Sequence, residues 1–156
     1  MQIKSVTIFR ILSVLILIVF AGNACSQGIE TSIISLRYAK AGKTIIRKFP
    51  YRISSATFLG TIRNKDGTVQ YYVVKEFFKI KAAIVYHGHS RVLFFDKNKH
   101  LKAQTIFDMP DELPFKLQKR SLYFKKKAGG IIIIIQEALE NNIPKILCGT
   151  LTTYEK

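Results

Sequence analysis

The sequence predicts a mainly β domain, or an α+β domain with little helix, whose strands form an antiparallel meander. The segment TVQYYVV at 68–74 is rich in the β-branched and aromatic residues typical of strands. Polar and apolar residues alternate with a period of two between 72 and 86, and turn-forming residues separate the apolar runs. Short turns join antiparallel strands, whereas parallel strands require long crossovers. We therefore expect the sheet to curl into a sandwich, a half-barrel or an incomplete barrel, with one short helix near the C-terminus.

Residues 1–26 are predicted to be a secretory signal peptide. A basic start with Lys4 and Arg10 is followed by the apolar run ILSVLILIVFA at 11–21. This run is about half as long as the roughly 20 apolar residues that a membrane-spanning helix needs. We therefore expect an exported protein, periplasmic or secreted, with no transmembrane span in its mature domain at 27–156.

Two kinds of processing are compatible with the end of this leader. Ala24 and Ser26 are the small side chains that signal peptidase requires for a cut before Gln27. The sequence GNAC resembles a bacterial lipobox, with Gly22 where the motif usually has Leu. In that alternative the chain is cut before Cys25, which is lipidated and anchors the protein to a membrane.

Cysteine usage excludes an internal disulfide in either case. Cys148 is the only other cysteine, and Cys25 is either removed or lipidated. The domain at 27–156 must therefore be stabilised by its hydrophobic core, for which it is long enough. We expect Cys148 to be a small buried side chain in a C-terminal strand.

Hairpin turns are predicted where polar and glycine-containing segments separate apolar runs. Such segments are RNKDGT at 63–68, DKNKH at 96–100 and HGHS at 87–90. An unbroken strand over 68–87 would extend about 65 Å, at roughly 3.3 Å per residue. We therefore also expect a bend, bulge or turn near 79–82.

The C-terminal part alternates between strand and loop patterns. DMPDELP at 108–114 predicts a loop or a single helical turn, and SLYFKKK at 121–127 predicts a strand. The five isoleucines at 131–135 favour a fully buried strand, followed by a short helix at QEALENN (136–142), although periodicity alone also allows one buried helix. The segment 145–154 is predicted to close the domain as a strand.

Positive charge is the strongest functional signal. The full chain carries +15, and removing Lys4 and Arg10 leaves +13 on the mature domain. Two segments, 37–52 and 116–127, contain no acidic residue and interleave aromatic residues with basic ones. Such surfaces attract polyanions, although lysine-rich faces also keep sheet edges soluble. The basic residues of these segments are Arg37, Lys40, Lys43, Arg47, Lys48, Arg52, Lys116, Lys119, Arg120, Lys125, Lys126 and Lys127.

Histidines provide the only pattern that suggests a metal. His87 and His89 are two residues apart, which places them on one face of a strand, and His100 lies across a predicted hairpin. The default interpretation is that they are polar turn residues, because Gly88 interrupts the pair. The chain contains no nucleophile elbow, phosphate-binding loop or dinucleotide fingerprint, so we expect neither an enzyme nor a cofactor.

These patterns predict a non-catalytic exported envelope protein that binds an anionic component. Export favours lipopolysaccharide, an acidic glycan or phospholipid headgroups over nucleic acid. One alternative is a carrier of a lipid or another apolar ligand, with a curled sheet lined by aromatic side chains. A second alternative is a metal-dependent hydrolase that uses the histidines. The aromatic residues proposed for the carrier are Phe77, Phe78, Tyr86, Phe94 and Phe95.

Overall fold

The computed structural model describes residues 29–38, 40–139, 143–147 and 150–154. The predicted leader with Cys25 lies outside the described residues, as does Cys148. Contacts divide the chain into two units, Met1–Glu30 and Thr31–Lys156. The fold described below is that of the second unit, to which almost all described residues belong.

The described chain is mainly β, with one α-helix on its N-terminal side, so the predicted fold class is confirmed. The strands pair antiparallel throughout. In chain order the elements are α2 (Glu30–Tyr38), β1 (Thr44–Phe49), β2 (Arg52–Arg63), β3 (Val69–Ala82), β4 (Val85–Phe95), β5 (Leu101–Phe107), the 3₁₀ turn η1 (Pro110–Glu112), β6 (Lys116–Gln118), β7 (Ser121–Ala128), β8 (Ile131–Ala138), β9 (Ile146–Leu147) and β10 (Thr150–Tyr154).

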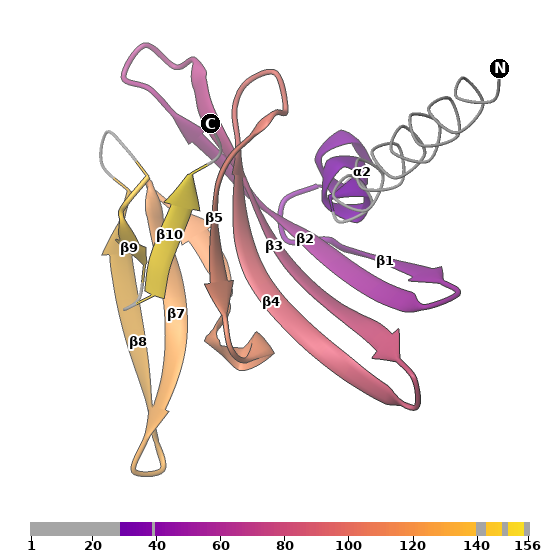
Figure 1. The fold of residues 1–156 in the computed structure, drawn as a ribbon. Coiled ribbons are helices and arrows are strands. Elements are labelled where there is room, and N and C mark those ends of the chain that lie inside the picture. Colours follow the sequence, from indigo (N-terminus) through magenta and orange to yellow (C-terminus); the bar gives the residue numbers. More distant parts are fainter. Residues whose placement is uncertain (1–28, 39, 140–142, 148–149, 155–156) are drawn as a thin grey trace, which may run out of the picture. The chain divides into compact units, whose positions relative to one another are not determined.

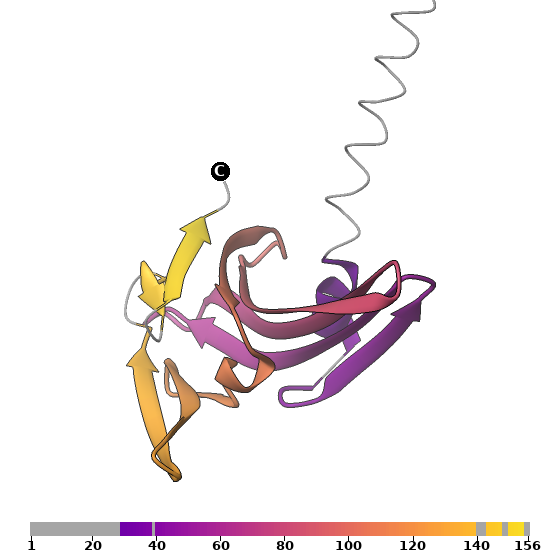
Figure 2. The same ribbon diagram turned by 60° about the horizontal axis from the view of Figure 1, so that its bottom comes forward.

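The strands form two sheets, and the larger one contains the predicted meander. Its order is β1-β2-β3-β4-β5-β10-β9, so the first five strands are neighbours in both sequence and space (Figure 1). After β5 the chain leaves to form the second sheet, β6-β7-β8, and β10 then returns to pair with β5. The larger sheet does not close on itself. In both views the β7–β8 hairpin extends away from it (Figures 1 and 2).

Two of the predicted hairpin turns are confirmed. Between β2 and β3, the Asn64 N–H donates to the Thr68 carbonyl at 2.9 Å, and Gly67 takes a positive φ of 83°. Between β4 and β5, the Asp96 N–H donates to the His100 carbonyl at 2.9 Å. Glycine and aspartate determine such turns locally, which is why the sequence alone predicts them.

The turn predicted at 87–90 is wrong, because these residues lie inside β4. The chain reverses at Ala83 and Ile84, just beyond the region where a bend was expected. Gly88 has a packing role instead: a Cβ atom at this position would lie 3.2 Å from Cε2 of Phe77 on β3. A glycine inside a strand often marks such a close approach rather than a turn.

The predicted C-terminal helix is also wrong. Strand β8 continues to Ala138, and it pairs with β7 from Ile131 to that residue. Residues 140–142 lie outside the described part of the chain. Pairing with β7 therefore overrides the helical preference of QEAL, and the strand interpretation of 131–135 is confirmed.

The α-helix found among the described residues is α2, which the sequence patterns did not predict. Its buried side chains are the small polar residues Thr31, Ser32 and Ser35, so it lacks the broad apolar stripe that identifies an amphipathic helix. The Ser35 hydroxyl donates to the Ser32 carbonyl at 2.7 Å. Within the described ranges, no helix is long and apolar enough to cross a membrane.

The two sheets share one hydrophobic core. Val73 and Phe94 contribute from the larger sheet, and Leu122 and Phe124 contribute from β7. The rings of Phe107 and Phe124 meet with their centroids 6.1 Å apart. Burial of these apolar side chains is the main favourable contribution to folding here, and it anchors the smaller sheet to the larger one.

A glycine bulge allows the sheets to approach each other. The register of β2 and β3 shifts between Phe58 and Gly60, and Gly60 has a φ of 146°. A Cβ atom at Gly60 would lie 3.3 Å from Cδ2 of Leu117 on β6. Bulges bend a strand locally and increase its twist, and this bulge lies where Leu117 of β6 packs against β2.

We predict that Phe94→Ala destabilises the domain by about 3–5 kcal/mol, because it leaves a cavity in the shared core. A loss of this size is a large fraction of the roughly 5–15 kcal/mol that stabilises a typical domain. The midpoint of urea unfolding, monitored by far-UV circular dichroism, measures this loss. Ile106→Ala, at a residue that is 55% exposed, is the control and should change the midpoint little.

Candidate functional site

The first basic segment does not form one charged surface. Lys40, Lys43 and Lys48 are exposed, but they are spread over the loop after α2 and strand β1. The guanidinium carbon of Arg47 lies 4.9 Å from the centroid of the Phe49 ring. The last member of the segment, Arg52, faces a buried carboxylate rather than solvent.

That carboxylate belongs to Glu76, which is fully buried in the middle of β3. It accepts hydrogen bonds from Nε of Arg91 at 2.7 Å and from the hydroxyl of Ser54 at 2.9 Å. Nη2 of Arg52 lies 3.4 Å from its Oε1 atom. The cluster therefore joins β2, β3 and β4 through charge-assisted hydrogen bonds, which are the stronger kind.

An aromatic ring covers the two arginines of this cluster. The guanidinium carbons of Arg52 and Arg91 lie 4.2 and 5.0 Å from the centroid of Phe78. The His89 ring stacks on Phe78 with a centroid distance of 4.9 Å. Cation–π contacts of this kind are favourable, and more so where water is excluded.

The Glu76 cluster, comprising Glu76, Arg52, Arg91, Ser54 and Phe78, has the geometry of a structural network. Its single carboxylate is surrounded by donors, so it offers no second carboxylate for acid–base chemistry. The sequence contained a signal for this cluster, because Glu76 was the one polar residue on the apolar face of 72–86. What the sequence could not show was which basic residues face it.

The second basic segment lies mainly on the smaller sheet. Nζ of Lys116 is 5.8 Å from the Tyr123 ring centroid, and Nζ of Lys125 is 5.0 Å from the Phe115 centroid. Lys126 and Lys127 are exposed on β7. This sheet therefore presents the interleaved basic and aromatic side chains that the sequence predicted.

Arg120 is the exception in this segment, because its donors are used inside the protein. Its Nε donates to the Leu139 carbonyl at 3.1 Å and its Nη2 donates to Oε1 of Gln70 at 3.1 Å. Its Nη1 donates to the Arg63 carbonyl. Arg120 thus connects the β6–β7 turn to the β2–β3 hairpin.

The lysines of β7 lie directly opposite the isoleucines of β8. Lys125 pairs with Ile134, and Lys127 pairs with Ile132. The prediction that the isoleucine strand is fully buried is wrong: residues 131–134 are all exposed. Only Ile135, nearest the core, packs against it. The hairpin reaches beyond the larger sheet (Figure 1), so no other element of the described chain covers its outer half.

A second exposed apolar segment is the β3–β4 turn. Ile84 is 92% exposed, and Val85 and Tyr86 are about half exposed. Lys79 and Lys81 flank it on β3. This segment comprises the turn and the start of β4, and it differs from the isoleucine run of β8 in that only Val85 and Tyr86 of its three apolar residues belong to a strand.

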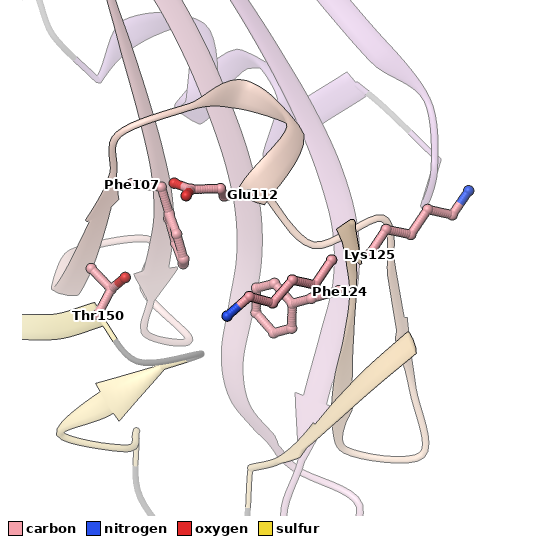
Figure 3. Close-up of a pocket in the computed structure, with 6 residues that line it drawn as sticks. Phe107, Glu112, Phe124, Lys125 and Thr150 are labelled. Atoms are coloured by element: carbon pink, nitrogen blue, oxygen red, sulfur yellow. The ribbon is translucent and has the colours of Figure 1, made fainter. Parts of the chain in front are cut away.

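A small pocket lies between the two sheets at η1 (Figure 3). Its volume is about 90 Å³, whereas pockets for drug-sized ligands typically have about 300–1,000 Å³. Figure 3 shows the Phe107 and Phe124 rings among the side chains that line it, with the Glu112 carboxylate beside Phe107. Its lining residues are Phe107, Glu112, Phe124, Lys125, Lys126 and Thr150.

The aromatic residues proposed for a carrier do not line one surface. Phe94 belongs to the shared core, and Phe77 packs against that core. Phe78 faces the Glu76 cluster on the opposite side of the sheet. Adjacent strand residues point to opposite faces, so Phe95 also points away from Phe94. Tyr86 lies at the exposed β3–β4 turn.

The three histidines are not brought together. His87 and His89 share a face of β4 near its start, whereas His100 follows the far end of the same strand. Asp96 is nine positions after His87, which corresponds to about 30 Å of strand. Among the residues that the structure describes, no group of three metal-ligating side chains is found.

Asp96 organises the turn that contains His100. Partial burial raises the pKa of Asp96, but hydrogen bonds from the backbone N–H groups of His100 and Asn98 and the charges of His100 and Lys102 outweigh it. The net effect is a lowered pKa. The ionised carboxylate therefore stabilises the folded state above the unfolded pKa of about 3.9.

No protein-family model, curated protein or solved structure matches this chain.

We predict that Glu76→Gln destabilises the domain by about 3–5 kcal/mol, because Arg52 and Arg91 lose the charge that compensates them in a water-poor site. The urea midpoint measures this loss. Asp111→Asn, which removes one exposed carboxylate from η1, is the control. Equal midpoints for the two variants would mean that the Glu76 cluster contributes no net stability.

We also predict that Asp96→Asn weakens the pH dependence of stability on the acid side. In the unmodified protein, the contribution of Asp96 is present above pH about 3.9 and is lost as the pH falls through its lower folded-state pKa. Unfolding curves at pH about 5 and about 3 should therefore differ less in the variant. Asp108→Asn serves as the control, and an unchanged difference for Asp96→Asn would contradict the assignment.

Proposed function

We propose that this protein is a non-catalytic, exported envelope module that binds an anionic component through the lysines of its smaller sheet. The observation that supports this proposal is the run Lys125, Lys126 and Lys127, which is exposed along β7. Lys116 and Lys119 are exposed on the same small sheet. No acidic residue occurs between 116 and 127 to offset their charge.

The smaller sheet is a better candidate than the first basic segment for a physical reason. Binding of a polyanion depends on charges that are close together and remain exposed to it. The first segment extends over a helix, a loop and two strands, and Arg52 is paired with Glu76. On β7 the three lysines are consecutive and exposed, with Lys125 and Lys127 on one face of the hairpin and Lys126 on the other, so their charges lie close together along one strand.

The partner expected outside the cytoplasm is rich in phosphate or carboxylate groups. Lipopolysaccharide, acidic glycans and phospholipid headgroups fit this chemistry. Near an anionic membrane each lysine contributes about 1 kcal/mol, and the attraction decays within a Debye length of about 8 Å at physiological salt. Binding of this kind is therefore weakened by salt.

We predict that the triple variant Lys125→Gln/Lys126→Gln/Lys127→Gln binds lipopolysaccharide and anionic vesicles about 100-fold more weakly, at about 1 kcal/mol per lysine. Glutamine keeps a polar, flexible side chain that is one atom shorter than lysine while removing its charge. The measurement is a binding titration at low and physiological salt, and the wild-type affinity should fall with salt.

The matched control is Lys40→Gln/Lys43→Gln/Lys48→Gln, which removes the same charge from the first basic segment. Its affinity should fall much less than that of the β7 variant. Equal losses would show that net charge alone matters, and salt-independent binding by the wild type would contradict the electrostatic mechanism.

A further inference from the structure

The outer half of β8 is apolar on both of its faces. Ile131, Ile132, Ile133 and Ile134 are 68, 58, 47 and 52% exposed. Consecutive strand residues point to opposite sides, so neither face of the hairpin is covered here by another part of the described chain. β8 is also an edge of its sheet, because its only pairing in the described chain is with β7.

The packing of the residues that the structure describes does not explain four consecutive exposed isoleucines. Contiguous apolar patches on soluble proteins generally mark interaction sites. Isoleucine at 131–134 is not needed for charge or turn formation, and β-branched threonine would support a strand as well. We therefore expect residues 131–134 to meet an apolar environment on both faces of the β7–β8 hairpin.

The lysines of β7 indicate that this apolar environment borders on anionic groups. Lys125, Lys126 and Lys127 lie directly across from Ile134, Ile133 and Ile132, on a strand about 4.8 Å away. Lysine extends its apolar stem along an apolar surface and keeps its ammonium group in water. A ribbon with one isoleucine strand and one lysine strand matches the boundary between acyl chains and anionic headgroups.

We propose that β8 inserts into the interfacial region of a phospholipid bilayer that contains anionic lipids. Ile131–Ile134 enter the acyl boundary, and Lys125–Lys127 remain at the headgroup level. This inference rests on the function proposed above and specifies its partner as a lipid surface. The insertion is shallow, because the outer edge of β8 presents backbone groups that still need water as a partner.

A second copy of the chain is the competing occupant, since an open apolar edge can pair with its equivalent. Charge argues against it. The mature domain carries +13, and pairing two β8 edges would bring two lysine rows near each other. Like charges oppose such an association, whereas anionic headgroups attract the same lysines.

The absence of tryptophan from the chain provides a direct test. We would introduce Ile132→Trp as the only tryptophan and mix the protein with vesicles of phosphatidylcholine and phosphatidylglycerol whose acyl chains carry bromine. Quenching and a blue shift of its emission are expected. Ile106→Trp on β5 replaces a residue of similar exposure, 55% against 58%, and should remain unquenched.

A second pair of variants separates insertion from charge attraction. Ile132→Thr/Ile134→Thr removes apolar area on one face of β8 but keeps all lysines. Its affinity for the anionic vesicles should fall at least about tenfold, given the usual value of burying an isoleucine. All variants share one N-terminus, so any contribution of residues 1–28 is the same in each.

The outcomes distinguish this inference from the function on which it rests. If the threonine variant binds like the wild type and the tryptophan of Ile132→Trp is not quenched, while the β7 lysine variant still loses affinity, insertion is wrong and polyanion binding stands. If the lysine variant also keeps its affinity, both fail. A lipid-free dimer of the wild type that the threonine variant abolishes would assign the surface to a second copy and overturn the inference.

Discussion

The packing of β7 against the larger sheet is the contact on which the arrangement of this domain depends. Leu122 and Phe124 enter the shared core, and Gly60 allows the adjacent strand β6 to approach β2. These residues hold the β7–β8 hairpin at one end only. The other end extends past the core, and it therefore presents lysines and isoleucines that no described element covers.

On the other face of the larger sheet, the Glu76 cluster compensates a buried carboxylate. A charged group inside a sheet is stable only when its partners are placed accurately. Arg91 and Ser54 satisfy the Glu76 carboxylate from the two neighbouring strands, and Phe78 covers both arginines. The same contacts remove Arg52 from the surface that could meet a polyanion.

Turns and strands were predictable wherever local chemistry decides the backbone conformation. Gly67 and Asp96 organise their hairpins through nearby backbone groups. The turn predicted at 87–90 was wrong because Gly88 lies within a strand, where the absence of a Cβ atom leaves space for Phe77 on β3. The helix expected at QEALENN failed for a similar reason, since pairing with β7 keeps the chain extended through Ala138.

The sequence by itself determined the antiparallel class and the excess of positive charge, because these follow from composition and short-range pattern. For the isoleucine run it favoured a strand but left a buried helix open, and pairing with β7 decided between the two. Only the tertiary structure decided which charges remain available. Arg52 meets a carboxylate 24 residues away and Arg120 meets an amide 50 residues away, contacts that local pattern does not encode. The tertiary structure also decided that Ile131–Ile134 are exposed to solvent, because their burial depends on whether a second layer reaches that part of the hairpin.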